Sequence, residues 1–187
     1  MANAAAKGNY MALSEAILVC LTERPMSGYD LAKNFDASIG FFWRASHQQI
    51  YRELGKLREK GYVESQEISQ SGKPNRIVHT ITPKGKTALM SWSSKPCRQP
   101  SIKDELLVKF YGVDGVDIRA FIEQLQLRME QHQTKLSKYM RIKARHFDGK
   151  DLTLNQKGKL IALELGVEQE KQNIENLTDA IEKVRGL

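Results

Sequence analysis

The sequence predicts a mainly α-helical fold with one small β-hairpin, divided between two domains. Apolar residues recur at helical spacing through most of the 187 residues, and the pattern changes to short β-branched segments only once, after Gly61. A segment with prolines and no periodicity, 96–102, then separates the two parts and is predicted to be a linker. We expect a disordered tail at 1–9, a first domain at 10–95 and a second domain at 103–187.

Two helices are predicted at the start of the first domain. The first carries Leu13, Ile17, Leu18 and Leu21 on one face and ends before Pro25. The second begins at Ser27, where Asp30 completes a partial capping box, and Gly40 stops it. Its predicted buried stripe is Leu31, Phe35 and Ile39.

The third helix has the clearest start. Ser46 is the expected N-cap, and Gln49 stands at the third helical position of a Ser-x-x-Gln capping box. Ile50, Leu54 and Leu57 form the predicted core face, and Gly61 is the expected C-terminal stop.

A two-stranded hairpin follows, with a basic, glycine- and proline-containing tip at residues 71–75. The second strand, 76–82, is rich in β-branched residues. Thr82 and Pro83 are then a typical N-cap and first residue of a fourth helix, expected to run to about Trp92.

The second domain is predicted to hold a short helix at about 103–111, broken at Gly112 and Gly115, and two long helices at about 117–147 and 155–184. Each long helix carries one stripe of residues spaced alternately by three and four, as in a coiled coil. The stripes are Ile118, Ile122, Leu125, Met129, His132, Leu136 and Tyr139, then Leu160, Leu163, Val167, Glu170, Ile174, Leu177, Ile181 and Val184, with Glu170 as an interruption. A second copy of the chain is the expected partner surface, which predicts a long-helix dimerisation domain. The alternative is that the stripes pack only on each other and on the first domain.

Charge is distributed unevenly between the domains. Residues 1–100 hold 14 Lys and Arg against 8 Asp and Glu, whereas residues 101–187 hold 15 against 14. The basic excess therefore lies in the first domain, which favours a polyanionic partner there. An ordinary basic surface is the simpler alternative.

Three short helices followed by a basic hairpin are the layout of a winged helix-turn-helix, which places the N-terminal part of its last helix in the major groove of double-stranded DNA. With the apolar face inward, amide, hydroxyl and cationic side chains lie outward, and Gln and Arg are the types that pair with adenine and guanine. The wing cations suit phosphate or minor-groove contact. The predicted DNA-binding residues are Ser46, His47, Gln48, Gln49, Tyr51, Arg52, Lys56, Lys73, Asn75 and Arg76.

Several of these residues also have purely structural explanations. Gln49 can serve only the cap, and Tyr51 can pack its ring under the wing while its hydroxyl touches a phosphate. Arg52 and Lys56 can belong to a solvated charged face around Glu53. Lys73 and Arg76 can be ordinary edge-strand cations. A helical adaptor whose winged helix binds protein rather than DNA is the alternative function.

Enzyme and membrane functions find no support in the sequence. The four histidines lack the spacing of a metal site or a triad, there is no glycine-rich phosphate loop, and Cys20 and Cys97 lie in unrelated contexts. Apolar stretches stay below the roughly 18 residues of a membrane span, and 1–9 lacks a signal-peptide core. We expect no catalytic residues, metal or cofactor, no membrane partner, and a cytoplasmic location.

The residues that carry these features resemble the PadR family of transcriptional regulators. The matching segments are Ser27–Leu31, Ile50–Leu54, Gly72–Pro74 and Thr80–Gly85; the run Ala37–Leu54 and the segment Asp104–Lys109 are similar to the AphA-type virulence activators of that family. Asn75 departs from the pattern, because many relatives carry a basic residue there, and the long helices match only by layout.

The resemblance implies a dimeric regulator on a partly palindromic promoter site. Members are often repressors released by a phenolic or other small-molecule effector, and AphA-like members can activate alongside a second regulator. Trp43, Trp92 and Phe110 are candidate residues for lining an effector pocket, although core packing is the simpler explanation for them. The operator, the sign of regulation and the effector are left open.

Overall fold

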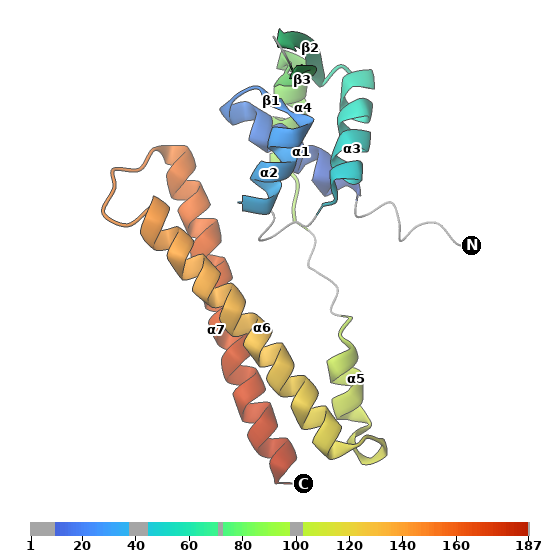
Figure 1. Cartoon of the computed structure of the whole chain (residues 1–187), viewed down its shortest axis with the longest axis vertical. Coiled ribbons are helices and arrows are strands. Elements are labelled where there is room, and N and C mark those ends of the chain that lie inside the picture. The colour runs from blue at the N-terminus through green and yellow to red at the C-terminus, as the bar shows by residue number, and fades with distance from the viewer. Residues whose placement is uncertain (1–9, 38–44, 71–72, 98–102, 187) are drawn as a thin grey trace, which may run out of the picture. The chain divides into compact units, whose positions relative to one another are not determined.

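The computed structural model describes residues 10–37, 45–70, 73–97 and 103–186 (Figure 1). The chain divides into two compact units, Met1–Gln99 and Pro100–Leu187. The predicted tail at 1–9, most of the predicted linker, Ile39 and Trp43 lie outside the described residues. None of the helices in the described ranges is both long enough and apolar enough to cross a membrane.

In its described residues, the first unit contains four α-helices and a small sheet. The helices are α1 (Tyr10–Glu23), α2 (Gly28–Ala37), α3 (His47–Glu59) and α4 (Pro83–Ser93), and the strands are β1 (Met26–Ser27), β2 (Val63–Gln70) and β3 (Lys73–Ile81). The sheet is antiparallel with the order β1-β3-β2. The hairpin of β2 and β3 is therefore the predicted wing. Strand β1 was not predicted, because two residues are too few to show an alternating pattern.

The predicted helix starts are confirmed by their capping bonds. Ser46 Oγ accepts a bond from the Gln49 amide at 3.2 Å, and the Gln49 side chain accepts one from the Ser46 amide at 2.8 Å. Ser27 and Asp30 make the same reciprocal pair at α2, and Thr82 caps α4 with Pro83 in its first turn. These bonds satisfy amides that the first turn of a helix otherwise leaves unpaired.

One apolar core holds the first unit together. The predicted core faces of α1, α2 and α3 are all buried in it, apart from the undescribed Ile39. Val63 and Ile81, which pair across the wing, close the core on the side of the sheet. Gly61 ends the α3 region at a φ of 69°, a conformation that glycine adopts without strain. Helix α3 is thus packed through one face onto the core of the first unit.

The second unit is built on two long antiparallel helices (Figure 1). They are α6 (Ile118–His146) and α7 (Leu154–Arg185), preceded by α5 (Glu105–Tyr111) and the 3₁₀ turn η2 (Val113–Gly115). Asp104 caps α5 and accepts two bonds from the Arg128 guanidinium, at 2.5 and 2.8 Å, which ties the start of α5 to α6.

The two predicted stripes lie largely against each other. Leu125 on α6 and Leu177, Ile181 and Val184 on α7 are buried in one cluster, with Ile118, Ile122 and Met129 half-buried around it. Phe121 is also buried there, although the predicted stripe did not include it. Phe110 of α5 packs edge-on against Phe121, with ring centroids 4.9 Å apart, so core packing accounts for this aromatic. In the described residues the two stripes thus cover each other in large part, and the predicted second copy of the chain stays a prediction.

Glu170 is part of this interface instead of interrupting it. Its side chain is 3% exposed, and its carboxylate contacts His132 Nδ1 and Lys135 Nζ of α6, each at 2.5 Å. Burial pushes the pKa of Glu170 upward, but the bonds from Lys135 and His132 outweigh it and hold the pKa below the ordinary value. His132 is thus bonded within its own chain.

Candidate DNA interface

The exposed face of α3 presents four of the side chains that are predicted to bind DNA. His47, Gln48, Gln49 and Arg52 are all exposed, on the first turns after the Ser46 cap. Gln48 and Arg52 are four residues apart and share a face opposite the buried Ile50 and Leu57. Gln49 has a demonstrated capping role, since its side-chain oxygen is bonded to the Ser46 amide. The arrangement leaves a polar surface of the kind that can enter a major groove.

Lys56 lies four residues after Arg52 and therefore on the same side of α3. Its ammonium donates to Glu53 Oε2 at 3.0 Å, and Glu53 is buried. Pairing with Lys56 supplies a charge partner for a carboxylate that would otherwise be expensive to bury. Lys56 therefore has a structural contact in addition to its predicted contact with DNA.

The wing residues also have contacts inside the fold. Asn75 donates from its side-chain amide to Glu67 Oε1 across the hairpin at 2.7 Å. Arg76 forms an ion pair with Asp30 of α2, and its side chain stays 41% exposed. The side chain of Lys73 lies outside the described part of the molecule. Among the three wing residues predicted to bind DNA, Arg76 is thus the one that an ion pair joins to the start of α2.

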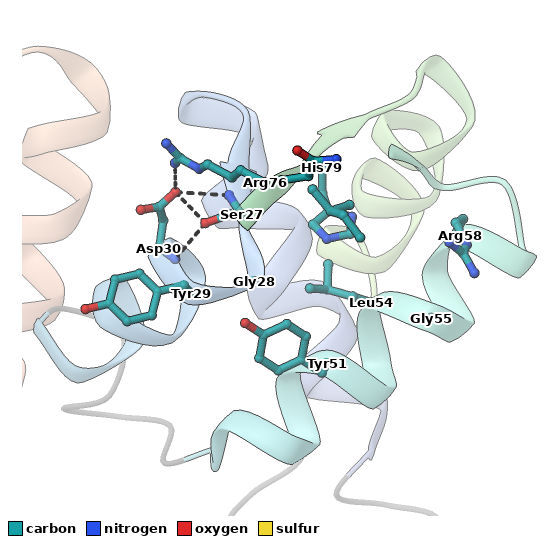
Figure 2. Close-up of a pocket in the computed structure, with 12 residues that line it drawn as sticks. Ser27, Gly28, Tyr29, Asp30, Tyr51, Leu54, Gly55, Arg58, Arg76 and His79 are labelled. Atoms are coloured by element: carbon teal, nitrogen blue, oxygen red, sulfur yellow. Dashed lines mark hydrogen bonds and ion pairs between the residues drawn. The ribbon is translucent and has the colours of Figure 1, made fainter. Parts of the chain in front are cut away.

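Asp30 joins the helix cap to the wing. Its carboxylate accepts bonds from the Ser27 amide, the Ser27 hydroxyl and Arg76 (Figure 2). Burial raises the pKa of Asp30, but the Ser27 bonds and the Arg76 guanidinium outweigh burial and lower the pKa below the usual 3.8. Asp30 is therefore held in its charged form, which keeps it bound to Arg76 at neutral pH.

A groove of about 700 Å³ runs between the start of α2, one flank of α3 and strand β3 (Figure 2). The ring of Tyr51, predicted to pack under the wing, lies against Gly28: a β-carbon there would come within 2.4 Å of it. Tyr51 nevertheless stays 52% exposed. Tyr29 and Arg58 also line the groove, and both are exposed.

Sequence reasoning missed Tyr29 and Arg58. Arg58 is seven residues after Tyr51, so helical spacing alone places both on one flank of α3 and could have indicated Arg58. Tyr29 gave no comparable signal, because its place at the groove depends on how α2 packs against α3. His79 lies behind them, bonded to Ser65; burial, and to a lesser degree the charge of Arg58, lower its pKa.

A capped helix with an exposed polar face, beside a β-hairpin wing on one compact core, defines the class of winged helix-turn-helix DNA-binding proteins. Comparisons with known proteins agree with that class. The model of the transcriptional regulator PadR-like family matches residues 17–91, and that of the virulence activator alpha C-terminal domain matches residues 102–185. The chain belongs to the PadR-like family of transcriptional regulators.

Individual relatives are similar along most of the chain. The probable transcriptional regulator Rv1176c of Mycobacterium tuberculosis is 35% identical, over 73% of this chain and 78% of the relative. Bacillus subtilis PadR in complex with operator DNA superposes with a TM-score of 0.81 at 26% identity, covering 92% of this chain and 99% of that one. The Vibrio cholerae virulence activator AphA gives a TM-score of 0.78 at 29% identity, covering 93% and 98%.

Proposed function

We propose that the chain regulates transcription as a homodimer, each copy placing α3 in the major groove of one half of a partly palindromic operator. The observation that carries the proposal is the exposed face of α3, where Gln48 and Arg52 stand one turn apart behind the Ser46 cap. Bacillus subtilis PadR, whose fold matches along 92% of this chain, has been crystallised with operator DNA. We assign base reading to His47, Gln48 and Arg52, and backbone contact to the wing with Ser46, Gln49, Tyr51 and Lys56.

The dimer rests on apolar side chains that the fold leaves uncovered. On α7, Leu154, Ile161 and Leu165 are 88%, 60% and 69% exposed, at spacings of seven and four that place them on one face. Met140 of α6 is also exposed. This stripe is separate from the seam that packs α6 on α7. A second copy offers the same stripe, which can cover it symmetrically.

A small-molecule effector is the second part of the proposal. Bacillus subtilis PadR, which is 32% identical over 67% of this chain, has been crystallised with p-coumaric acid. We propose that an aromatic acid of this kind releases the present chain from DNA. Trp92, at the end of α4, is 38% exposed and available for such a contact. For an activating role, the resemblance to AphA-type activators implies a second regulator on the same promoter.

The test is a mobility-shift titration on a duplex selected by the wild-type protein, with an unrelated duplex of equal length. Arg52→Ala should weaken binding to the selected duplex by at least about tenfold, and weaken binding to the unrelated duplex less, because a base contact is lost. Unchanged affinity of Arg52→Ala for the selected duplex would refute the assigned orientation of α3.

The adaptor alternative makes a different prediction about salt. DNA binding through several cations weakens steeply as salt rises, because condensed counterions are released on binding. If the wild-type chain shows no salt-dependent binding to any duplex, the winged helix serves another partner.

A further inference from the structure

Gly55 is a glycine in the middle of α3 for which the fold itself gives no reason. It has ordinary helical backbone, since the only glycines with positive φ in the described ranges are Gly61 and Gly149. A β-carbon built on Gly55 would have no described atom of the chain within 4 Å beyond its own helix. Glycine inside a helix is unfavourable relative to alanine. Gly55 thus costs helix stability without allowing any close packing within the chain.

The position of Gly55 on α3 indicates that the open space beside it belongs to the groove. Tyr51, Gly55 and Arg58 recur at four and seven residues, so they form one flank of α3, and all three line the groove beside β3. This flank adjoins the face of Gln48 and Arg52, because Gln48 lies seven residues before Gly55. Glycine also occurs where a ligand must approach a backbone closely. The empty space over Gly55 is therefore open toward the groove.

The chemistry around this space suits an anionic polymer. Arg58 and Arg76 are the cations that line the groove, and Tyr29 and Tyr51 bring phenolic hydroxyls (Figure 2). Asp30 is the one carboxylate among the described lining residues, and its charge is offset by Arg76. Arginine and tyrosine side chains are common donors to DNA phosphates.

We propose that this groove seats the sugar-phosphate backbone of one operator strand, which runs over Gly55 between α3 and the wing and is held by Arg58 and Tyr29. The inference rests on the proposed DNA-binding function and adds contacts that it does not assign. Gly55 lets the strand approach the helix, while Arg58 donates to a phosphate. Because phosphates are the same in every sequence, these contacts contribute equally to specific and non-specific binding.

Replacing Gly55 by alanine or by methionine distinguishes a role in DNA contact from a role in folding. Gly55→Ala should raise the midpoint of thermal unfolding by about 3 °C, because alanine favours the helix. The same change should lower affinity for both the selected and the unrelated duplex, and the longer Gly55→Met should lower it further. A more stable protein that binds DNA less well is the expected result.

Arg58→Gln supplies an independent measurement. It should weaken binding to both duplexes by the same factor, about five- to tenfold, and reduce the slope of log affinity against log salt by about one. Lys86→Gln, an exposed position on α4 away from the groove, is the control with the same loss of charge and should keep the wild-type slope.

The outcomes distinguish this inference from the function on which it rests. If the wild-type chain binds no duplex, the proposed function fails. If it binds and Gly55→Met and Arg58→Gln both keep wild-type affinity, the backbone does not lie in the groove, which would then be free for a protein segment. A loss on the selected duplex alone would make Arg58 a base-reading residue and would also overturn the inference.

Discussion

Asp30 connects three parts of the DNA-binding unit through a single carboxylate. It caps α2, fixes the Ser27 hydroxyl and binds Arg76 of the wing. Since Arg76 is 46 residues away in sequence, this pair also restrains the wing relative to α2. The wing cation Arg76, predicted to bind DNA, is therefore partly neutralised by Asp30, and its contribution to DNA affinity should be smaller than that of a cation without such a partner.

Asp30→Asn isolates the charge of this carboxylate, because asparagine keeps an oxygen that can cap the helix. The pKa of Asp30 is lower in the folded state than its usual 3.8, so its charge stabilises the fold above that pH. The stabilisation is lost as the pH falls through the lower folded value. We expect the wild-type chain to exceed Asp30→Asn in unfolding free energy at pH 7, with the difference shrinking below about pH 4.

Urea titrations of both proteins between pH 7 and pH 3 measure this difference. A difference that stays constant over the whole range would show that the charge of Asp30 is not coupled to folding. Ser69→Ala, an exposed residue of the wing, is a control that should show no pH-dependent difference.

At the level of single residues, the sequence predicted what local spacing determines. The Ser46 and Gln49 capping box and the burial of Ile50, Leu54 and Leu57 are confirmed, because both follow from helical geometry. The sequence did not reveal that Arg76 binds Asp30 or that Tyr51 lies against Gly28. Those contacts depend on how α2, α3 and the wing pack, which no short pattern contains. The roles of the ten predicted residues at DNA remain predictions.

Among the elements, the pair α6 and α7 depends on a buried polar contact within an apolar seam. Glu170 lies in that seam and is bound by His132 and Lys135, while the Lys135 ammonium also lies 5.5 Å from the centre of the Tyr139 ring. Seam spacing correctly placed His132 and Glu170 inward, yet gave no indication that they face each other. Which residue meets which depends on the register of the two helices, fixed by the turn between them.

Lys135→Met tests the importance of this contact. Methionine keeps an apolar stem of similar length against Tyr139 but removes the cation, which leaves the buried Glu170 carboxylate in contact with His132. We expect Lys135→Met to lower the unfolding free energy by about 2–3 kcal/mol. This loss is small for a broken buried ion pair, because the Lys135 side chain is 41% exposed.

The double variant Lys135→Met with Glu170→Leu serves as the comparison for the single one. It replaces the charged pair by apolar groups and should regain much of the lost stability, since a buried ion pair often contributes little net free energy over apolar packing. Equal stability of the wild-type chain and Lys135→Met in a urea titration would contradict the importance assigned to the contact.

For the whole molecule, the separation of tasks between the units leads to a prediction about assembly. Ile161→Lys with Leu165→Lys places two cations in the exposed stripe of α7 and should convert the proposed dimer into a monomer in sedimentation experiments, because burying charges at an interface is costly. Glu182→Lys, exposed near the other end of the same helix and 17 residues beyond Leu165, should leave the dimer intact. A dimer that survives the double substitution would show that another surface joins the copies.

A fragment that ends at Lys95 tests how the first unit behaves by itself. All of α1 to α4 and the wing lie within it, and their core is self-contained. We expect the fragment to be monomeric and to bind the selected duplex at least about tenfold more weakly than the full chain, since it contacts one half-site at a time. A stable dimer of the fragment in sedimentation would contradict this separation.

The central claim, that two copies of α3 read two related half-sites, is tested most directly by selecting bound duplexes from a random library and sequencing them. We expect enriched sequences with two inverted half-sites whose centres lie about 10 base pairs, or a multiple of that, apart. Enrichment of a single unpaired motif would contradict the proposed dimeric reading, and the absence of any enriched motif would contradict sequence-specific recognition by α3.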